Sequence, residues 1–204
     1  MTNIHEIKAK TQAVYDRKAK AWDHGRKISS GEEAWISELL RGVPSESAVL
    51  DLGCGTGKPL AQYAMDAGLK LTGLDSSPEM IRLAQANFPQ AKWVVQDMCQ
   101  WDEPDTYDII HSWDGFFHLS PEEQRRLLPK LAEGLRAGGK LLLTIGDGEE
   151  EVIGQVHGDP VYHASLSHSE YTKLLEAAGI GSATISDYDH FDANRIVLFA
   201  TKAA

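Results

Sequence analysis

The sequence predicts an open, doubly wound α/β fold, in which helices cover both faces of a mostly parallel, seven-stranded sheet and an N-terminal helical segment precedes the sheet. Two observations lead to this prediction. Short apolar segments of strand length alternate with amphipathic segments of helix length along the chain. Turn and cap sequences rich in glycine, serine and proline stand between them. Such sheets bind ligands at the carboxyl ends of their strands, so the loops after the strands form the candidate site.

The first half of the chain opens with two amphipathic segments and continues with alternating strands and helices. The first segment carries Ile4, Ile7 and Val14 on one face, with Lys and Glu between them. Ser77-Pro78 supplies an N-cap and a first-turn proline. The expected elements are helices at 3–20 and 31–41, a strand at 48–52, a helix at 58–68, a strand at 69–75 and a helix from 78.

The second half repeats this alternation. Ser120 and Glu123 form a capping box, and Pro129 is expected to kink the helix that follows. Gly138-Gly139 is expected to end that helix. The expected elements are strands at 91–96 and 106–112, a helix at 120–136, a strand at 140–145, a helix at 167–179, and strands at 182–187 and 194–201.

Residues 146–166 interrupt the pattern, because they are rich in glycine and acidic residues and show no clean periodicity. We expect an irregular insertion there, of the kind that is often functional or mobile. The sequence contains no internal repeat and no linker. It therefore predicts one domain over residues 1–204, with a lid segment at 1–45 and an α/β core at 46–204.

Composition narrows the classes of partner. The net charge of −10 repels phosphate backbones, and no dense cluster of Lys or Arg offsets it, so nucleic acid is not an expected partner. No segment approaches the roughly eighteen apolar residues that span a membrane, and the first ten residues lack the apolar centre of a secretion signal. Cys54 and Cys99 have neither metal-ligand nor disulfide spacing. We expect a cytoplasmic protein without membrane contact.

A glycine-rich segment, Asp51-Leu52-Gly53-Cys54-Gly55-Thr56-Gly57, follows the strand at 48–52. A phosphate-binding P-loop would require glycine in place of Leu52 and Ser or Thr in place of Pro59. A dinucleotide fingerprint would require glycine in place of Lys58. The pattern that remains is G-x-G-x-G behind an acidic residue at a strand end.

This pattern resembles motif I of the class I methyltransferases that use S-adenosyl-L-methionine (AdoMet) and release S-adenosyl-L-homocysteine (AdoHcy), which have a Rossmann-like fold. The resemblance runs from Val49 to Ile145. It implies that the glycines flank the methionine part of AdoMet and that Asp51 lies near its ammonium group. It also implies that Asp75 accepts hydrogen bonds from the ribose and that Asp97 and the next backbone amide bind adenine.

The N-terminal segment contains Tyr15-Asp16 and Ala21-Trp22-Asp23, which resemble the entry segment of many small-molecule methyltransferases, a lid over the cofactor. A helix face packed on the sheet explains the same residues. Arg26 is a weaker candidate partner for the AdoMet carboxylate. The residues expected to bind the cofactor are Tyr15, Trp22, Asp51, Gly53, Cys54, Gly55, Gly57, Asp75, Ser76, Met80, Asp97, Met98, Ser112 and Trp113.

The loop after the fourth strand, at 112–118, is expected to line the acceptor pocket, because in this family it lies beside the transferable methyl group. Methyl transfer by in-line displacement depends chiefly on positioning. Asp114 could orient or deprotonate the acceptor, and His163 is a candidate general base. The expected pocket residues are Phe116, Phe117, His118 and Tyr162.

Several alternatives stay open at this point. A protein that senses AdoMet or AdoHcy without chemistry has the same cofactor motifs, and an NAD(P) oxidoreductase is a further alternative that Lys58 disfavours. His157, His163 and His168 lack the spacing of a metal site, so no metal is expected. The small-molecule acceptor, the atom that is methylated and the oligomeric state are not determined by the sequence.

Overall fold

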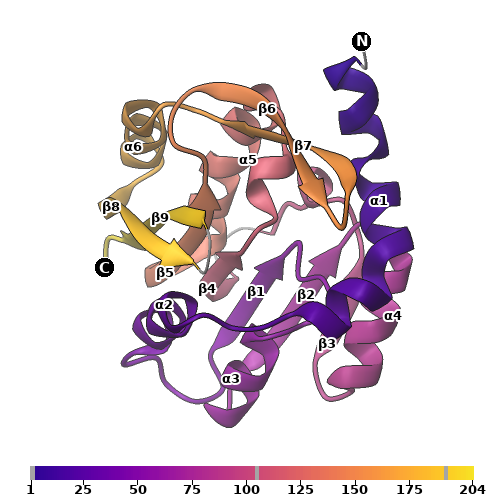
Figure 1. Ribbon diagram of the computed structural model, residues 1–204. Helices are drawn as coiled ribbons and strands as arrows, with labels where there is room; N and C mark the ends of the chain where they lie inside the picture. Colours follow the sequence, from indigo (N-terminus) through magenta and orange to yellow (C-terminus); the bar gives the residue numbers. More distant parts are fainter. Residues whose placement is uncertain (1–2, 104–105, 191–192) are drawn as a thin grey trace.

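The computed structural model describes residues 3–103, 106–190 and 193–204 (Figure 1). Within these residues, seven strands form one mostly parallel sheet, as predicted, and their order is β3-β2-β1-β4-β5-β9-β8. The strands of this sheet are β1 (Ala48–Leu52), β2 (Lys70–Asp75), β3 (Lys92–Val95), β4 (Tyr107–Ser112), β5 (Leu135–Ile145), β8 (Ile180–His190) and β9 (Ala193–Lys202). The last two are longer than expected. The first two residues of the predicted lid segment lie outside the described residues.

Strand pairing places a switch point in the middle of the sheet. β1 pairs in parallel with both β2 and β4, so the chain moves outward from β1 to β3 and then returns to the other side of β1. β9 is antiparallel to both β5 and β8. Loops that leave β1 and β4 in opposite directions open a crevice at their carboxyl ends, which is where such sheets bind ligands.

The helices begin where the sequence predicts them. They are α1 (Ile4–Gly25), α2 (Ser30–Leu40), α3 (Leu60–Asp66), α4 (Pro78–Asn87), α5 (Pro121–Gly134) and α6 (His168–Ala177), with single turns η1 (Met98–Gln100) and η2 (Phe116–His118). Ser77 and Ser167 accept the expected N-cap hydrogen bonds, and Ser120 and Glu123 form both halves of a capping box. α5 continues past Pro129, and α1 continues past residue 20, which brings Trp22 into the helix.

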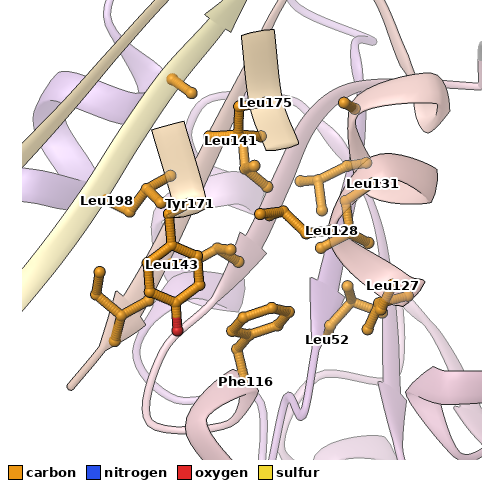
Figure 2. Packing of buried hydrophobic residues seen from close by; sticks show 14 of the residues in the cluster. Leu52, Phe116, Leu127, Leu128, Leu131, Leu141, Leu143, Tyr171, Leu175 and Leu198 are labelled. Carbon is orange, nitrogen blue, oxygen red and sulfur yellow. The ribbon is translucent and has the colours of Figure 1, made fainter. Parts of the chain in front are cut away.

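The core has two layers, one on each face of the sheet. One face packs against α5 and α6 through Leu128, Leu131, Tyr171 and Leu175, and Figure 2 shows these side chains around Leu143 of β5. The other face packs against α2, α3 and α4. Burial of these apolar side chains fixes the strands, and with them the positions of the loops at their carboxyl ends.

The expectation of an irregular insertion at 146–166 was wrong. This segment forms a β-hairpin of β6 (Glu150–Val156) and β7 (Asp159–Ser165), separate from the main sheet. The loop between the strands is His157-Gly158, and both residues have positive φ, of 48° and 83°. Two-residue hairpin loops require this conformation, so His-Gly between short strands was the signal that the acidic composition obscured.

The predicted end of the helix at Gly138-Gly139 was also wrong. α5 ends at Gly134, and β5 already begins at the buried Leu135, opposite Tyr107. The two glycines lie inside β5, where the register between β4 and β5 shifts. The burial of Leu135 holds the chain to the sheet before the glycines are reached, so they shape a strand irregularity instead of a helix end.

α1 lies along the carboxyl edge of the sheet, between α4 and the hairpin (Figure 1). Among the described residues, no helix has both the length and the apolar composition that crossing a bilayer requires.

Candidate functional site

A cavity of about 340 Å³ lies at the carboxyl ends of β1, β2 and β4 and beneath α1. Its volume is in the range of small-molecule sites. Twelve of the residues predicted to bind the cofactor line it, and these are Tyr15, Trp22, Asp51, Gly53, Cys54, Gly55, Asp75, Ser76, Met80, Asp97, Met98 and Trp113. Asp114 and His118 line it as well. Segments that are far apart in sequence therefore meet at one site.

Six predicted site residues, all described by the structure, do not line this cavity. Gly57 supports the loop from behind, because a Cβ there would lie 2.7 Å from the Trp93 ring. The Ser112 hydroxyl donates a hydrogen bond to the carbonyl oxygen of Leu52 at 2.7 Å. Both residues therefore hold the shape of the site without facing it.

The remaining four of these residues belong to the acceptor side of the prediction. Phe116 is fully buried and packs against Tyr171, on the α6 side of the sheet (Figure 2). Tyr162 is fully buried, and its hydroxyl donates to Glu151. Phe117 and His163 contact each other edge to face, with ring centroids 4.7 Å apart.

The glycine loop and Asp75 form one hydrogen-bonded unit. The backbone N–H of Gly55, at a φ of 53°, donates to Asp75 Oδ2 at 2.9 Å, and the N–H of Ser77 donates to Oδ1 at 2.8 Å. Burial raises the pKa of Asp75 to about 6, while the two backbone donors and the charge of Asp51 act in opposite directions on it. Each carboxylate oxygen keeps a lone pair for a further donor.

Tyr15 on α1 is joined to His118 in the loop after β4. The Tyr15 hydroxyl lies 2.8 Å from His118 Nε2, and His118 Nδ1 lies 2.7 Å from the carbonyl oxygen of Tyr162. A carbonyl oxygen only accepts, so Nδ1 carries the proton and Tyr15 donates to Nε2. Burial lowers the pKa of His118 to about 4, which keeps the imidazole neutral, and burial also raises the pKa of Tyr15.

Polar contacts fix α1 to both of its neighbours. Asp16 accepts hydrogen bonds from the Ser77 hydroxyl at 2.6 Å and from the Glu79 N–H at 3.0 Å, at the start of α4. On the hairpin side, Arg17 pairs with Asp159 at 2.8 Å. α1 therefore closes the cavity as a strap between two separate elements.

Asp114 has an unusual backbone conformation for a residue that is not glycine, with a φ of 54°. Its N–H donates to the Thr144 hydroxyl at 2.7 Å, and its Oδ1 lies 3.1 Å from Nε of Arg195 on β9. Strained positions of this kind persist where the surroundings hold them, and they are frequent at functional sites. Arg195 was not predicted, because only the antiparallel return of β9 brings it to this loop.

Sequence reasoning also missed His111, which lines the cavity next to Asp51. Its Nδ1 lies 2.7 Å from Asp51 Oδ1, and both side chains are buried. The only sequence signal was a histidine directly after the apolar pair Ile109-Ile110 of β4. Arg26 lines the cavity as proposed for a carboxylate partner, but it already forms a two-pronged ion pair with the buried Glu32.

The three histidines considered for metal binding occupy different elements. His157 is in the hairpin loop, His163 is on β7, and His168 begins α6. Within residues 3–103, 106–190 and 193–204, no cluster of three or more metal-ligating side chains is present.

Sequence comparison gives a family match and several relatives. A family model described as a methyltransferase domain matches residues 49–139. An uncharacterized methyltransferase from Bacillus cytotoxicus is 34% identical, over 54% of this chain and 53% of that protein. A trans-aconitate 2-methyltransferase from Azoarcus sp. is 31% identical, over 64% of this chain and 53% of that protein. The chain spans about half the length of these curated relatives.

Two solved structures share the fold across the whole chain. Phosphoethanolamine N-methyltransferase 2 of Haemonchus contortus, in complex with S-adenosyl-L-methionine, has a TM-score of 0.74 at 16% identity and covers 100% of this chain and 61% of its own. The 1,6-didemethyltoxoflavin-N1-methyltransferase of Burkholderia thailandensis has a TM-score of 0.73 at 18% identity, with coverage of 100% and 92%. At these identities, the likeness shows the fold.

Proposed function

We propose that this chain, a member of the class I AdoMet-dependent methyltransferases, transfers the methyl group of AdoMet to a small-molecule acceptor by in-line displacement. The observation that carries the proposal is the cavity at the switch point. Its wall brings together the glycine loop after β1, Asp75 at the end of β2 and Asp97 after β3. These groups suit the amino-acid end, the ribose and the adenine of one elongated ligand.

The residues of the wall fit such a ligand. A Cβ at Gly53 would lie 3.2 Å from both the Met98 side chain and the Gly115 Cα, so glycine keeps the loop backbone open between them. Asp75, already oriented by two backbone donors, accepts the ribose hydroxyls on its remaining lone pairs. Asp97 accepts from the adenine amino group. AdoMet supplies an activated methyl group on its sulfonium.

The acceptor side is formed by Tyr15, Asp114 and His118. The Tyr15 hydroxyl donates to the neutral His118, which leaves the phenol oxygen to accept a hydrogen bond from an acceptor N–H or O–H. Asp114 orients the acceptor from the loop after β4. Burial lowers the pKa of both His118 and His163, so positioning, more than proton abstraction by an imidazole, supports the reaction.

We assign α1 the role of a lid, because it bridges α4 and the hairpin across the cavity. Closure of α1 excludes water from the reacting groups. We further propose that residues 1–204 act as one domain in the cytoplasm, on a small molecule and not on nucleic acid, since the net charge is −10.

The proposal is tested by following a labelled methyl group from AdoMet to its acceptor. Purified protein is incubated with AdoMet labelled in its methyl group and a metabolite extract, and labelled products are identified by mass spectrometry. The proposal predicts a labelled small molecule that Asp114→Ala protein produces far more slowly. A folded protein that binds AdoMet tightly but labels no compound in extracts of several organisms would contradict it and indicate a sensor.

A further inference from the structure

Asp51 and His111 form a buried pair in the floor of the cavity. They are register partners on the parallel strands β1 and β4, so their side chains leave the sheet on the same face. Asp51 is 4% exposed and His111 is 3% exposed, and both line the cavity. The distance of 2.7 Å between His111 Nδ1 and Asp51 Oδ1 is that of a short, charge-assisted hydrogen bond.

The direction of this bond follows from its chemistry. A carboxylate oxygen only accepts, so His111 Nδ1 carries the hydrogen and donates it. Oδ1 of Asp51 is thereby directed to the ring, and the other carboxylate oxygen keeps its lone pairs. Because strand pairing fixes both backbones, the ring has little freedom to release the carboxylate.

For folding alone, an apolar side chain at position 111 would be more favourable than histidine. Two residues before this position is Ile109 of β4, and two residues after it, just past the end of β4, is Trp113; both are buried. Nε2 of His111 is buried and has no hydrogen-bond partner among the described residues. Burial of an unpaired nitrogen opposes folding, so the contribution that the imidazole makes here is its bond to Asp51.

The hydrogen bond between His111 and Asp51 lies in a cavity that holds two acidic side chains. Asp51 and Asp75 share the cavity, and the charge of Asp51 acts against ionisation of Asp75. The hydrogen bond from His111 fixes the position of the Asp51 carboxylate relative to Asp75. A cationic ligand group then meets a carboxylate that needs no reorganisation.

We propose that His111 is a positioning residue, which holds the Asp51 carboxylate so that its free oxygen receives the α-ammonium group of the cofactor. This inference rests on the proposed function, since it requires an AdoMet-type ligand. It assigns no chemical step to His111. The inference concerns affinity for the amino-acid end of the cofactor. Ligands with and without that end can therefore test it.

The experiment measures ligand selectivity by calorimetry. AdoHcy carries the amino-acid end, and 5′-methylthioadenosine lacks it but keeps the adenosine and the sulfur. His111→Leu removes the donor to Asp51. His111→Asn keeps it, because the amide nitrogen of Asn is as many bonds from the backbone as Nδ1. Tyr171→Phe removes a buried hydroxyl on the other face of the sheet and is the stability control.

We expect His111→Leu to weaken AdoHcy binding about tenfold and 5′-methylthioadenosine binding less than about twofold. His111→Asn should stay within about threefold of the wild type for both ligands, and Tyr171→Phe should change neither affinity. If His111→Leu does not fold, His111→Gln replaces it, since its amide extends past the position of Nδ1.

Equal losses for both ligands, an unchanged affinity for AdoHcy, or a His111→Asn protein as weak as His111→Leu would each overturn the inference. Failure of the proposed function is a different result. In that case, the wild-type protein binds neither ligand.

Discussion

The hydroxyl of Tyr15 lies 2.8 Å from Nε2 of His118, and this hydrogen bond joins α1 to the loop after β4. Both residues line the cavity, although they are far apart in sequence. Both side chains are half-buried. In the proposed function, the bond therefore couples the position of α1 to the residues assigned to the acceptor.

Tyr15→Phe should lower turnover about tenfold, because the His118 nitrogen loses its donor, at a cost of about 1–3 kcal/mol, and an acceptor loses its contact with the phenol oxygen. AdoHcy affinity should change less than about threefold. Steady-state kinetics and calorimetry measure the two effects. Tyr63→Phe is the matched control, since its hydroxyl donates to Glu33 on the surface. Equal effects of the two substitutions on turnover would count against the lid contact.

Asp75→Ala should weaken AdoHcy binding at least tenfold, through loss of charge-assisted bonds worth about 1.5–3 kcal/mol each before desolvation. In the wild type, affinity should fall as the pH drops through about 6, because burial raises the pKa of Asp75 to about 6 and the protonated carboxyl is a weaker acceptor. Titrations across this range, with Asp75→Asn as reference, measure the effect. A wild-type profile as flat as that of Asp75→Asn would remove the assignment.

The same shift has a consequence for stability. The folded-state pKa of Asp75 lies above its ordinary value of 3.8, so the folded state holds the proton more tightly than the unfolded state. This group therefore stabilises the unliganded fold below about pH 4, and the contribution is lost as the pH rises through about 6. Denaturant unfolding at several pH values checks this sign. A stability that depends on pH in the same way in Asp75→Ala protein would contradict it.

Gly57→Ala should destabilise the protein by about 2–4 kcal/mol, because its φ is +81° and a Cβ would lie 2.7 Å from the Trp93 ring. Gly138→Ala is the matched control. Its φ is +75°, but a Cβ there meets no atom within 4 Å, so only the backbone strain of about 1 kcal/mol applies. Denaturant unfolding compares them. Equal losses would show that crowding behind the glycine loop is unimportant.

Asp114→Ala should lower turnover at least tenfold and change AdoHcy affinity less than about twofold, because Asp114 is assigned to the acceptor. Comparison of turnover with calorimetry separates the two effects. A loss of AdoHcy affinity as large as the loss of turnover would show that Asp114 binds the cofactor instead of the acceptor. Thr144→Val removes the hydroxyl that accepts from the Asp114 N–H. It should also lower turnover with little change in AdoHcy affinity, but by less than Asp114→Ala.

The sequence allowed accurate prediction of what local patterns determine. The apolar strands, the caps at Ser77, Ser120 and Ser167, and the mostly parallel sheet implied by alternating strands and helices all agree with the structure. The glycine loop could be placed for the same reason, because motif and strand end are adjacent in the chain. Its likeness to a known family then located Asp75 and Asp97 at the neighbouring strand ends.

Contacts set by strand register could not be predicted in this way. His111 meets Asp51 only because β4 pairs with β1 in one register, and Arg195 meets Asp114 only because β9 returns antiparallel to β5. The hairpin was missed because its loop is His157-Gly158, in place of the more familiar Asn-Gly or Asp-Gly. His163 then lies on the hairpin instead of the cavity wall.

The central claim is that the cavity at the ends of β1, β2 and β4 binds an adenosyl ligand with an amino-acid end. Calorimetric titration of the wild-type protein with AdoHcy, and separately with NADH, tests it most directly. The account predicts saturable binding of one AdoHcy per chain and no heat with NADH. Binding of NADH without binding of AdoHcy, or no binding of AdoHcy by folded protein, would contradict it.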